Sequence, residues 1–334
     1  MPQDVEFALP FRTRISPDAD AARARSLDWC RRRGLVTNSV DEGRFRRWDI
    51  AGLMAAWIPD ASGDRLDLAV DAVLVATFLD DQFDGPLARQ TRRVRAVCHA
   101  FHDVMAPSGG APEESGPLVT AFAEMWGRLS RGASAERIDR TARHWGWYFD
   151  AYAEEADHRA RRRIPTVEEH FALRRRSGFV YAMTDLSQQA YGFELPRRAY
   201  DDPVLRRMLD ITADVIDTLN DVHSVEKEES RGDLHNLVLV IEQESDCGRR
   251  ESIARIQGLI GDWTREFLEH ERMLLDGAGR DGPALRTFVD CLRSAMSGYL
   301  HWSRTCRRYS QLIPPAEPAL AADLVRTGIH TQIR

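Results

Sequence analysis

The stretch LVATFLDDQFDGP, residues 74–86, joins an apolar segment to a cluster of acids. Eleven of the twelve residues at positions 68–79 are apolar or threonine, which predicts a buried helix. Three acids follow within five positions: Asp80, Asp81 and Asp84. They stand at the predicted C-terminal end of the helix, where the helix dipole is negative and further negative charge is unfavourable. One interpretation is a solvated helix end, and the other is a docked cation such as Mg²⁺, which prefers carboxylate oxygens.

The composition is that of a globular chain, and it argues against several classes of function. Of 334 residues, 43% are hydrophobic and 29% are charged, as in soluble proteins, and the net charge of -6 gives no nucleic-acid signature. The longest apolar run is shorter than the roughly 20 residues that span a bilayer, so we expect no membrane insertion. The first residues lack the continuous apolar core of a secretory signal. Five scattered cysteines without CxxC spacing indicate reduced thiols and a cytoplasmic location.

Helical periodicity runs through most of the chain. Apolar residues recur with a period of 3.6 in residues 204–219 and 284–302, which predicts amphipathic helices. The β-rich run LVLVI at 237–241 lies inside a longer helical pattern, so we interpret it as buried helix. Segments that predict loops or connectors are few: 106–117, 158–165, 276–283 and 313–318. The pattern predicts a single all-α domain of roughly ten to twelve helices, given the usual length of a helix.

A second polar cluster lies in DTLNDVHSVEKEE, residues 217–229. Asn220, Ser224 and Glu228 are spaced i, i+4, i+8, so they line one face of a helix. An amide oxygen, a hydroxyl and a carboxylate form an oxygen-only set that suits Mg²⁺. An exposed helix face is the alternative interpretation. Two acids four positions apart offer an alternative ligand pair: Asp217 and Asp221.

Basic residues that could contact an anion held by such a metal ion occur at three places. Lys227 lies inside the second cluster, three arginines are consecutive at 174–176, and Arg308 precedes Tyr309. Three consecutive arginines on a helix point in three directions, so at most two can serve one site. Gly178, inside a helical pattern, costs ~1 kcal/mol relative to alanine and indicates a helix break or a close approach. For any single arginine, an ordinary surface position is the alternative.

Taken together and in this order, these elements resemble bacterial class I terpene synthases. The DDxxD motif of that family matches positions 80–84, the NDxxSxxxE motif matches positions 220–228, and the terminal RY pair matches positions 308–309. The family also carries a diphosphate-sensing arginine, followed three and four positions later by a linker and an effector. The residues at this spacing are Arg174, Ser177 and Gly178. The similarity runs from about residue 7 to residue 310.

The resemblance implies a single-domain helical bundle over residues 1–334, with a core at about 7–310 and a tail at 311–334. It implies a central apolar cavity with three Mg²⁺ ions at its mouth. Asp80, helped by Asp84, would hold two ions, and whether Asp81 or Asp84 contacts metal stays open. The third ion would be held by Asn220, Ser224 and Glu228. The diphosphate would receive hydrogen bonds from Arg174, Lys227, Arg308 and Tyr309.

Ionising an allylic diphosphate separates a cation from an anion, so an apolar cavity with aromatic faces should follow the charged mouth. Phe78 and Trp302 are the main candidates for its wall, and Phe83 and Trp57 are weaker ones. An ordinary core position is the alternative for each of these aromatic residues. Three further residues are expected to widen the pocket: Thr77, Gly178 and Met183.

By resemblance, the expected function is a Mg²⁺-dependent cyclase that converts farnesyl diphosphate into a cyclic sesquiterpene and diphosphate. A diterpene synthase acting on geranylgeranyl diphosphate is the alternative. A chain-elongating prenyltransferase shares the fold but carries a second aspartate-rich motif, where this chain has the Asn/Ser/Glu motif. A helical binding module without activity is the remaining alternative. Homodimers are common among relatives, which makes a homodimer a candidate assembly, but the sequence itself does not fix the oligomeric state.

Overall fold

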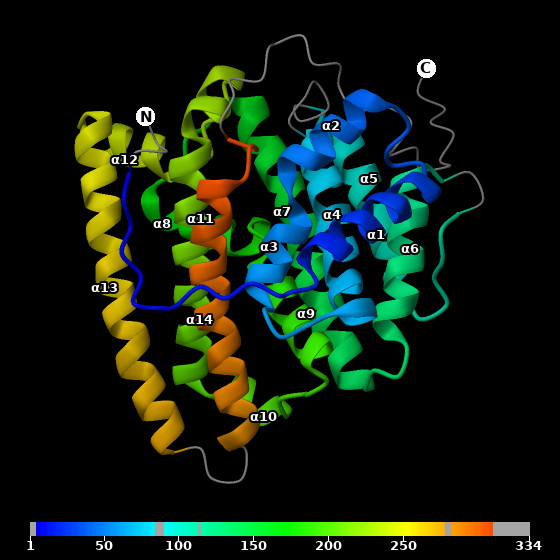
Figure 1. Cartoon of the computed structure of the whole chain (residues 1–334). Coiled ribbons are helices and arrows are strands. Elements are labelled where there is room, and N and C mark those ends of the chain that lie inside the picture. Colours follow the sequence, from blue (N-terminus) through cyan, green and yellow to red (C-terminus); the bar gives the residue numbers. More distant parts are fainter. Residues whose placement is uncertain (1–4, 84–89, 113–114, 278–281, 310–334) are drawn as a thin grey trace.

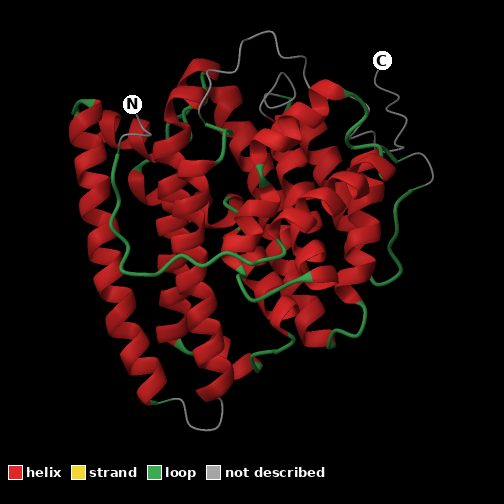
Figure 2. Cartoon of the chain, viewed as in Figure 1, coloured by secondary structure: helices red, strands yellow, loops and turns green. Residues whose placement is uncertain are grey.

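The computed structural model describes residues 5–83, 90–112, 115–277 and 282–309. Within these ranges the regular structure is helical and no β-strand occurs, which confirms the all-α prediction (Figure 2). The helices are α1 (Ala19–Arg32), α2 (Ser39–Trp48), α3 (Ile50–Trp57), α4 (Gly63–Phe83), α5 (Thr91–Met105), α6 (Pro117–Ser130), α7 (Ala135–Arg161), α8 (Val167–Ser177), α9 (Val180–Tyr191), α10 (Arg197–Asp201), α11 (Pro203–Arg231), α12 (Leu237–Ser245), α13 (Arg249–Asp276) and α14 (Gly282–Thr305).

The described residues form more helices than the sequence predicted, and two of the breaks contain a side-chain-bearing residue with positive φ. Asp49, with φ 47°, separates α2 from α3, and its side chain then caps α3 by accepting a hydrogen bond from the Gly52 N–H. Phe179, with φ 66°, separates α8 from α9. This left-handed conformation is uncommon for residues with a side chain, so the sequence pattern gives little warning of the break at Asp49, whereas Gly178, which ends α8, had indicated a break or a close approach.

Helix α4 runs through the middle of the molecule and is buried along most of its length (Figure 1). Helices α1, α3, α6 and α9 pack around it. Helix α14 packs closely on α3, because Gly298 has no side chain: a Cβ there would lie 2.6 Å from the carbonyl oxygen of Ala56. The apolar run 68–79 is therefore core helix, as predicted.

Two long helices complete the frame around the centre. Helix α7 packs on α5 and α8, and α11 packs on α13, α14, α8 and α9. Helix α7 continues to Arg161, so the connector predicted at 158–165 starts later than expected. The capping box of Thr166 and Glu169 then begins α8, and Gly232 in the left-handed conformation ends α11.

The apolar run 237–241 lies in α12, with Val238 and Val240 fully buried, so its prediction as buried helix is confirmed. The loop predicted at 106–117 separates α5 from α6. The segment 313–318 lies outside the described residues. Among the helices that the structure describes, none combines the length and apolarity needed to cross a bilayer.

Candidate active site

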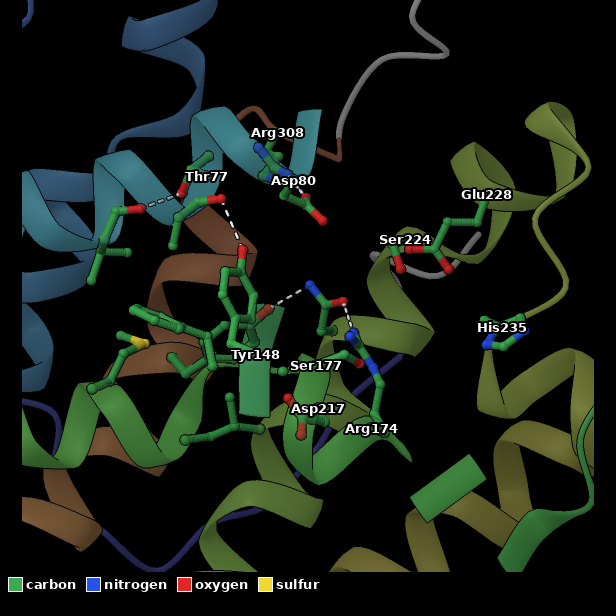
Figure 3. Close-up of a pocket in the computed structure, with 18 of the residues that line it drawn as sticks. Thr77, Asp80, Tyr148, Arg174, Ser177, Asp217, Ser224, Glu228, His235 and Arg308 are labelled. Atoms are coloured by element: carbon green, nitrogen blue, oxygen red, sulfur yellow. Dashed lines mark hydrogen bonds and ion pairs between the residues drawn. The ribbon is translucent and has the colours of Figure 1, made fainter. Parts of the chain in front are cut away.

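A cavity of about 160 Å³ opens between α4, α7, α11 and α14, with the junction of α8 and α9 at its inner end. Figure 3 shows Asp80 and Arg308 on one side of the cavity and Ser224 and Glu228 on the other. Apolar side chains lie among the polar ones that line it: Ile50, Leu53, Val73, Ala76, Phe179, Met183, Ile216 and Trp302. The cavity thus has two facing polar walls over a partly apolar interior.

The acidic cluster of the opening stretch forms the α4 wall. Asp80 lines the cavity, where it accepts a hydrogen bond from the Tyr152 hydroxyl at 3.0 Å and pairs with the Arg308 guanidinium at 2.8 Å. The same Arg308 nitrogen lies 3.2 Å from Asp81, which is not among the lining residues. Asp84 lies outside the described residues, so its predicted role stays a prediction.

The opposite wall is the α11 face on which Asn220, Ser224 and Glu228 were predicted to align. All three line the cavity. The Asn220 carbonyl oxygen accepts a hydrogen bond from Arg174 at 2.5 Å, and its amide donates to the hydroxyls of two tyrosines at 2.8 Å, Tyr299 and Tyr309. Glu228 accepts a hydrogen bond from the Asn236 amide at 2.9 Å.

The alternative ligand pair separates into two different environments. Asp217 lines the cavity, whereas Asp221 is fully buried behind it. The Asp221 carboxylate lies 2.9 Å from Nε2 of His170, and it accepts hydrogen bonds from Arg174 Nε at 3.1 Å and from the Leu237 N–H at 2.8 Å. Burial alone would raise the pKa of Asp221, but the Arg174 charge and the His170 hydrogen bond hold that pKa below its usual value. Asp221 therefore positions Arg174 rather than facing the cavity.

The three consecutive arginines diverge, as helical geometry requires. Arg174 lines the cavity. Arg175 pairs with buried Asp214, with Nε 2.7 Å from Oδ1, and Arg176 pairs with Glu154 at 2.6 Å. Only the first of the three contributes to this site. The other predicted diphosphate-binding residues, Lys227, Arg308 and Tyr309, also line the cavity.

The end of α8 meets α11 at the inner side of the cavity. Ser177 and Gly178 both line it there. Gly178 is required by close approach, since a Cβ at this position would lie 2.0 Å from Oδ1 of Asp217. The resemblance implies that Ser177 is the linker that follows the sensing Arg174. In the described part of the chain, however, the Ser177 hydroxyl has no hydrogen-bond partner, so no such bond to Arg174 is present.

The aromatic wall differs from the prediction. Trp302 lines the cavity, but Phe78 does not: it packs edge-on against Trp48, with ring centroids 4.9 Å apart. The cavity-facing stripe of α4 consists of Val73, Ala76, Thr77 and Asp80. Phe78 lies about 100° round the helix from its neighbour Thr77, which turns the ring into the core.

The weaker candidates, Phe83 and Trp57, are core residues as well. Phe83 packs on Tyr152, and the Trp57 indole donates a hydrogen bond to Ser187. Met183 and Thr77 line the cavity as expected. Sequence reasoning missed four aromatic residues that also line it: Tyr148, Tyr152, Phe179 and Tyr299. Tyr148 and Tyr152 are four apart on α7, but helical spacing alone does not separate cavity wall from core.

A further polar group beside Glu228 was also missed. Arg159 contacts the carboxylates of Glu155 and Asp233, each at 2.9 Å, and all three residues line the cavity. His235 lies next to them, and burial lowers the pKa of its imidazole to about 4. Its ring is therefore neutral at physiological pH. In the sequence, this group was indicated only by the basic run at 158–165, which contains Arg159.

The donor set fits a hard divalent cation. Asp80, Asn220, Ser224 and Glu228 offer oxygen atoms only. Burial, with the nearby charges of Asp221 and Asp233, raises the pKa of Glu228 to about 8, and a cation beside this carboxylate would oppose that shift. Clusters of three or more His, Cys, Asp or Glu side chains suited to a metal do not occur in the described ranges, because the α11 set uses an amide and a hydroxyl. The Asn220 oxygen already accepts from Arg174, so that contact must loosen before Asn220 can hold a metal.

Comparisons with known proteins agree with this arrangement. The family described as terpene synthase family 2, C-terminal metal binding, matches residues 71–266. Pentalenene synthase of Streptomyces arenae is 35% identical over 332 residues, which cover 96% of each chain. A 7-epi-alpha-eudesmol synthase of Streptomyces viridochromogenes, which cyclises (2E,6E)-farnesyl diphosphate, is 34% identical over 93% of each chain. The solved structure of linalool/nerolidol synthase from Streptomyces clavuligerus has a TM-score of 0.80 and 31% identity, over 90% of this chain and 100% of that one.

The matching family and relatives, together with the all-α fold, show a class I terpene synthase. The chain belongs to terpene synthase family 2, and it is a terpene cyclase of the lyase class.

Proposed function

We propose that this chain is a Mg²⁺-dependent cyclase that ionises farnesyl diphosphate and releases a cyclic sesquiterpene and diphosphate. The observation that carries the proposal is the pair of facing walls: Asp80 on α4 lies across the cavity from Ser224 and Glu228 on α11. Hydrogen-bond donors line the cavity with them: Arg174, Lys227, Arg308 and Tyr309. A substrate with a charged head and an apolar tail matches a cavity that has polar walls and a partly apolar interior.

The residues of this chain would bind and orient the diphosphate. Arg174 and Arg308 present planar guanidinium groups that grip phosphate oxygens in pairs, and they stay charged at any working pH. Asp80, with Asn220, Ser224 and Glu228, would hold Mg²⁺, for which three ions are expected. When bound, Mg²⁺ supplies positive charge that stabilises the departing diphosphate. Tyr152 would position Asp80 through its 3.0 Å hydrogen bond.

The inner cavity would hold the carbocation. Faces of Trp302 and Phe179 line it, and aromatic faces attract positive charge. Met183 and Ile216 add apolar wall that limits the entry of bulk water. The contour of this wall would decide how the isoprenyl tail of the substrate folds before ring closure.

Farnesyl diphosphate is favoured because two similar enzymes are described as cyclising it: the eudesmol synthase above and a (-)-beta-caryophyllene synthase of Saccharothrix espanaensis. Geranylgeranyl diphosphate remains the alternative substrate. The shorter geranyl diphosphate is a further candidate, because the linalool/nerolidol synthase from Streptomyces clavuligerus was also solved in complex with 2-fluorogeranyl diphosphate. The homodimer and the cytoplasmic location stay predictions, and size-exclusion chromatography with light scattering tests the first.

The deciding experiment incubates the enzyme with geranyl, farnesyl or geranylgeranyl diphosphate and Mg²⁺, and identifies products by gas chromatography–mass spectrometry. We expect a cyclic C15 product and diphosphate release with farnesyl diphosphate. Parallel reactions with added isopentenyl diphosphate test chain elongation, which would give longer diphosphates instead. Absence of any hydrocarbon or terpene alcohol with every chain length would exclude the cyclase.

A further inference from the structure

Two residues that line the cavity each carry a buried polar atom without a hydrogen-bond partner in the described ranges. Within the described residues, the Ser177 hydroxyl and Oδ2 of Asp217 make no hydrogen bond. Both residues line the cavity, and their side chains are largely buried. They are neighbours, because Asp217 occupies the space beside Gly178, the residue that follows Ser177, as Figure 3 also shows. Apolar residues line the same region, namely Phe179, Met183 and Ile216.

A buried polar atom without a partner is unfavourable, so this pair of groups calls for a third group that satisfies both. A water molecule needs at least two polar partners and roughly 10–15 Å³ of space. The two side chains supply the partners, and the cavity of about 160 Å³ supplies the space. The pair is therefore a candidate site for one water molecule in the wall of the cavity.

Both side chains can hydrogen-bond a water molecule. Burial raises the pKa of Asp217 above its usual value, while the Arg174 charge opposes that shift. A carboxyl oxygen accepts a hydrogen bond from water in either protonation state, and the Ser177 hydroxyl can both donate and accept one.

We propose that Ser177 and Asp217 hold the water molecule that captures the final carbocation, so that the product is a terpene alcohol. This inference rests on the proposed cyclase function and narrows its product class. The water oxygen forms a C–O bond to the cation, and the resulting oxonium loses one proton to the diphosphate already released. The balance is R–OPP³⁻ + H₂O → R–OH + HP₂O₇³⁻, and no further reactant is needed. Ser177 and Asp217 act as positioning residues.

The test measures product class and oxygen source in the full-length enzyme. With farnesyl diphosphate and Mg²⁺ in H₂¹⁸O, we expect a single-enantiomer sesquiterpene alcohol that carries ¹⁸O. The variants Ser177→Ala and Asp217→Leu should each lower the alcohol-to-hydrocarbon ratio at least about fivefold, as expected for the loss of one hydrogen bond to the water. Asp217→Asn keeps hydrogen-bonding capacity and should restore most of the alcohol. The ratio is counted per turnover, so a slower variant still reports it.

Thr218 provides the matched control. Its hydroxyl is also buried and without a partner in the described ranges, and it sits on the same helix, but it does not line the cavity. Thr218→Val should leave the alcohol fraction unchanged. A hydrocarbon product from the wild-type enzyme, or unlabelled alcohol, would overturn the inference while leaving the cyclase intact. Labelled alcohol that persists in both Ser177→Ala and Asp217→Leu would also overturn it. Failure to release diphosphate from any substrate would overturn the cyclase itself.

Discussion

Replacing Arg174 tests the site directly, because a matched control arginine lies on the same helix. Its side chain is 19% exposed, lines the cavity, and contacts Asn220 and Asp221. Arg176 lies two residues away on the same helix, but it pairs with Glu154 and does not line the cavity. The two arginines therefore form a matched pair of test and control.

The expected magnitude follows from the contacts. Two charge-assisted hydrogen bonds from Arg174 to the departing diphosphate contribute about 3–6 kcal/mol, at roughly 1.5–3 kcal/mol each. At about 1.4 kcal/mol per tenfold change, Arg174→Ala should lower kcat/KM by roughly 10²–10⁴. Arg174→Lys keeps a charge near Asp221 but loses the planar fork, so we expect a smaller loss and a nearly unchanged melting temperature. For Arg176→Ala the change should stay within about twofold, because exposed ion pairs contribute little.

The assay is steady-state diphosphate release from farnesyl diphosphate with saturating Mg²⁺, with thermal melts of each variant. Arg174→Ala should also lower the melting temperature, since the buried Asp221 carboxylate loses a charged partner. The lysine variant distinguishes that loss of stability from lost catalysis. If Arg176→Ala lowers kcat/KM as much as Arg174→Ala does, or if Arg174→Ala stays within about threefold of the wild type, the assignment of Arg174 is wrong.

Three further experiments test other parts of the site. Asn220→Ala and Glu228→Ala should abolish turnover while circular dichroism stays helical; full activity in both would contradict the metal assignment. Mg²⁺ and diphosphate together should raise the melting temperature by more than the sum of their separate effects, because each brings the counter-charge for the other; additive shifts would oppose this. Tyr152→Phe removes a hydrogen bond to the Asp80 carboxylate, so kcat/KM should fall about tenfold, whereas Tyr181→Phe, outside the cavity, should change nothing. Equal rates for the two tyrosine variants would remove Tyr152 from the site.

The sequence predicted those features that depend on local spacing. The alignment of Asn220, Ser224 and Glu228 on one helical face needs only the 3.6-residue period, and all three line the cavity. The divergence of the three arginines follows from the same geometry. The run at 237–241 was assigned to helix because its surroundings were helical, and α12 confirms this. Each of these inferences joins residues that lie within a few turns of one another.

Features that depend on distant contacts could not be predicted. The Tyr152 hydroxyl reaches Asp80 across 72 positions of sequence, and nothing in either local pattern indicates the pair. Asp217 and Asp221 share a face by spacing, yet only the positions of α8 and α12 decide that Asp217 lines the cavity while Asp221 lies behind it. Phe78 was expected in the wall because it is close to Asp80 in sequence. Its direction is set by its helical angle and by Trp48, which lies thirty positions earlier.

The acidic end of α4 is stabilised by one counter-charge from the end of the described chain and by a hydroxyl from α7. A carboxylate at a helix C-terminus is opposed by the helix dipole, and Asp80 and Asp81 also repel each other. Arg308 contacts both, at 2.8 and 3.2 Å, and the Tyr152 hydroxyl donates a further hydrogen bond. The guanidinium of Arg308 also lies over the Trp48 ring, 5.5 Å from its centroid, which holds the cation in place. The residue that resolves the repulsion is therefore the same one that the site would use to bind diphosphate, so the acids and their partner cation are assembled before any substrate enters.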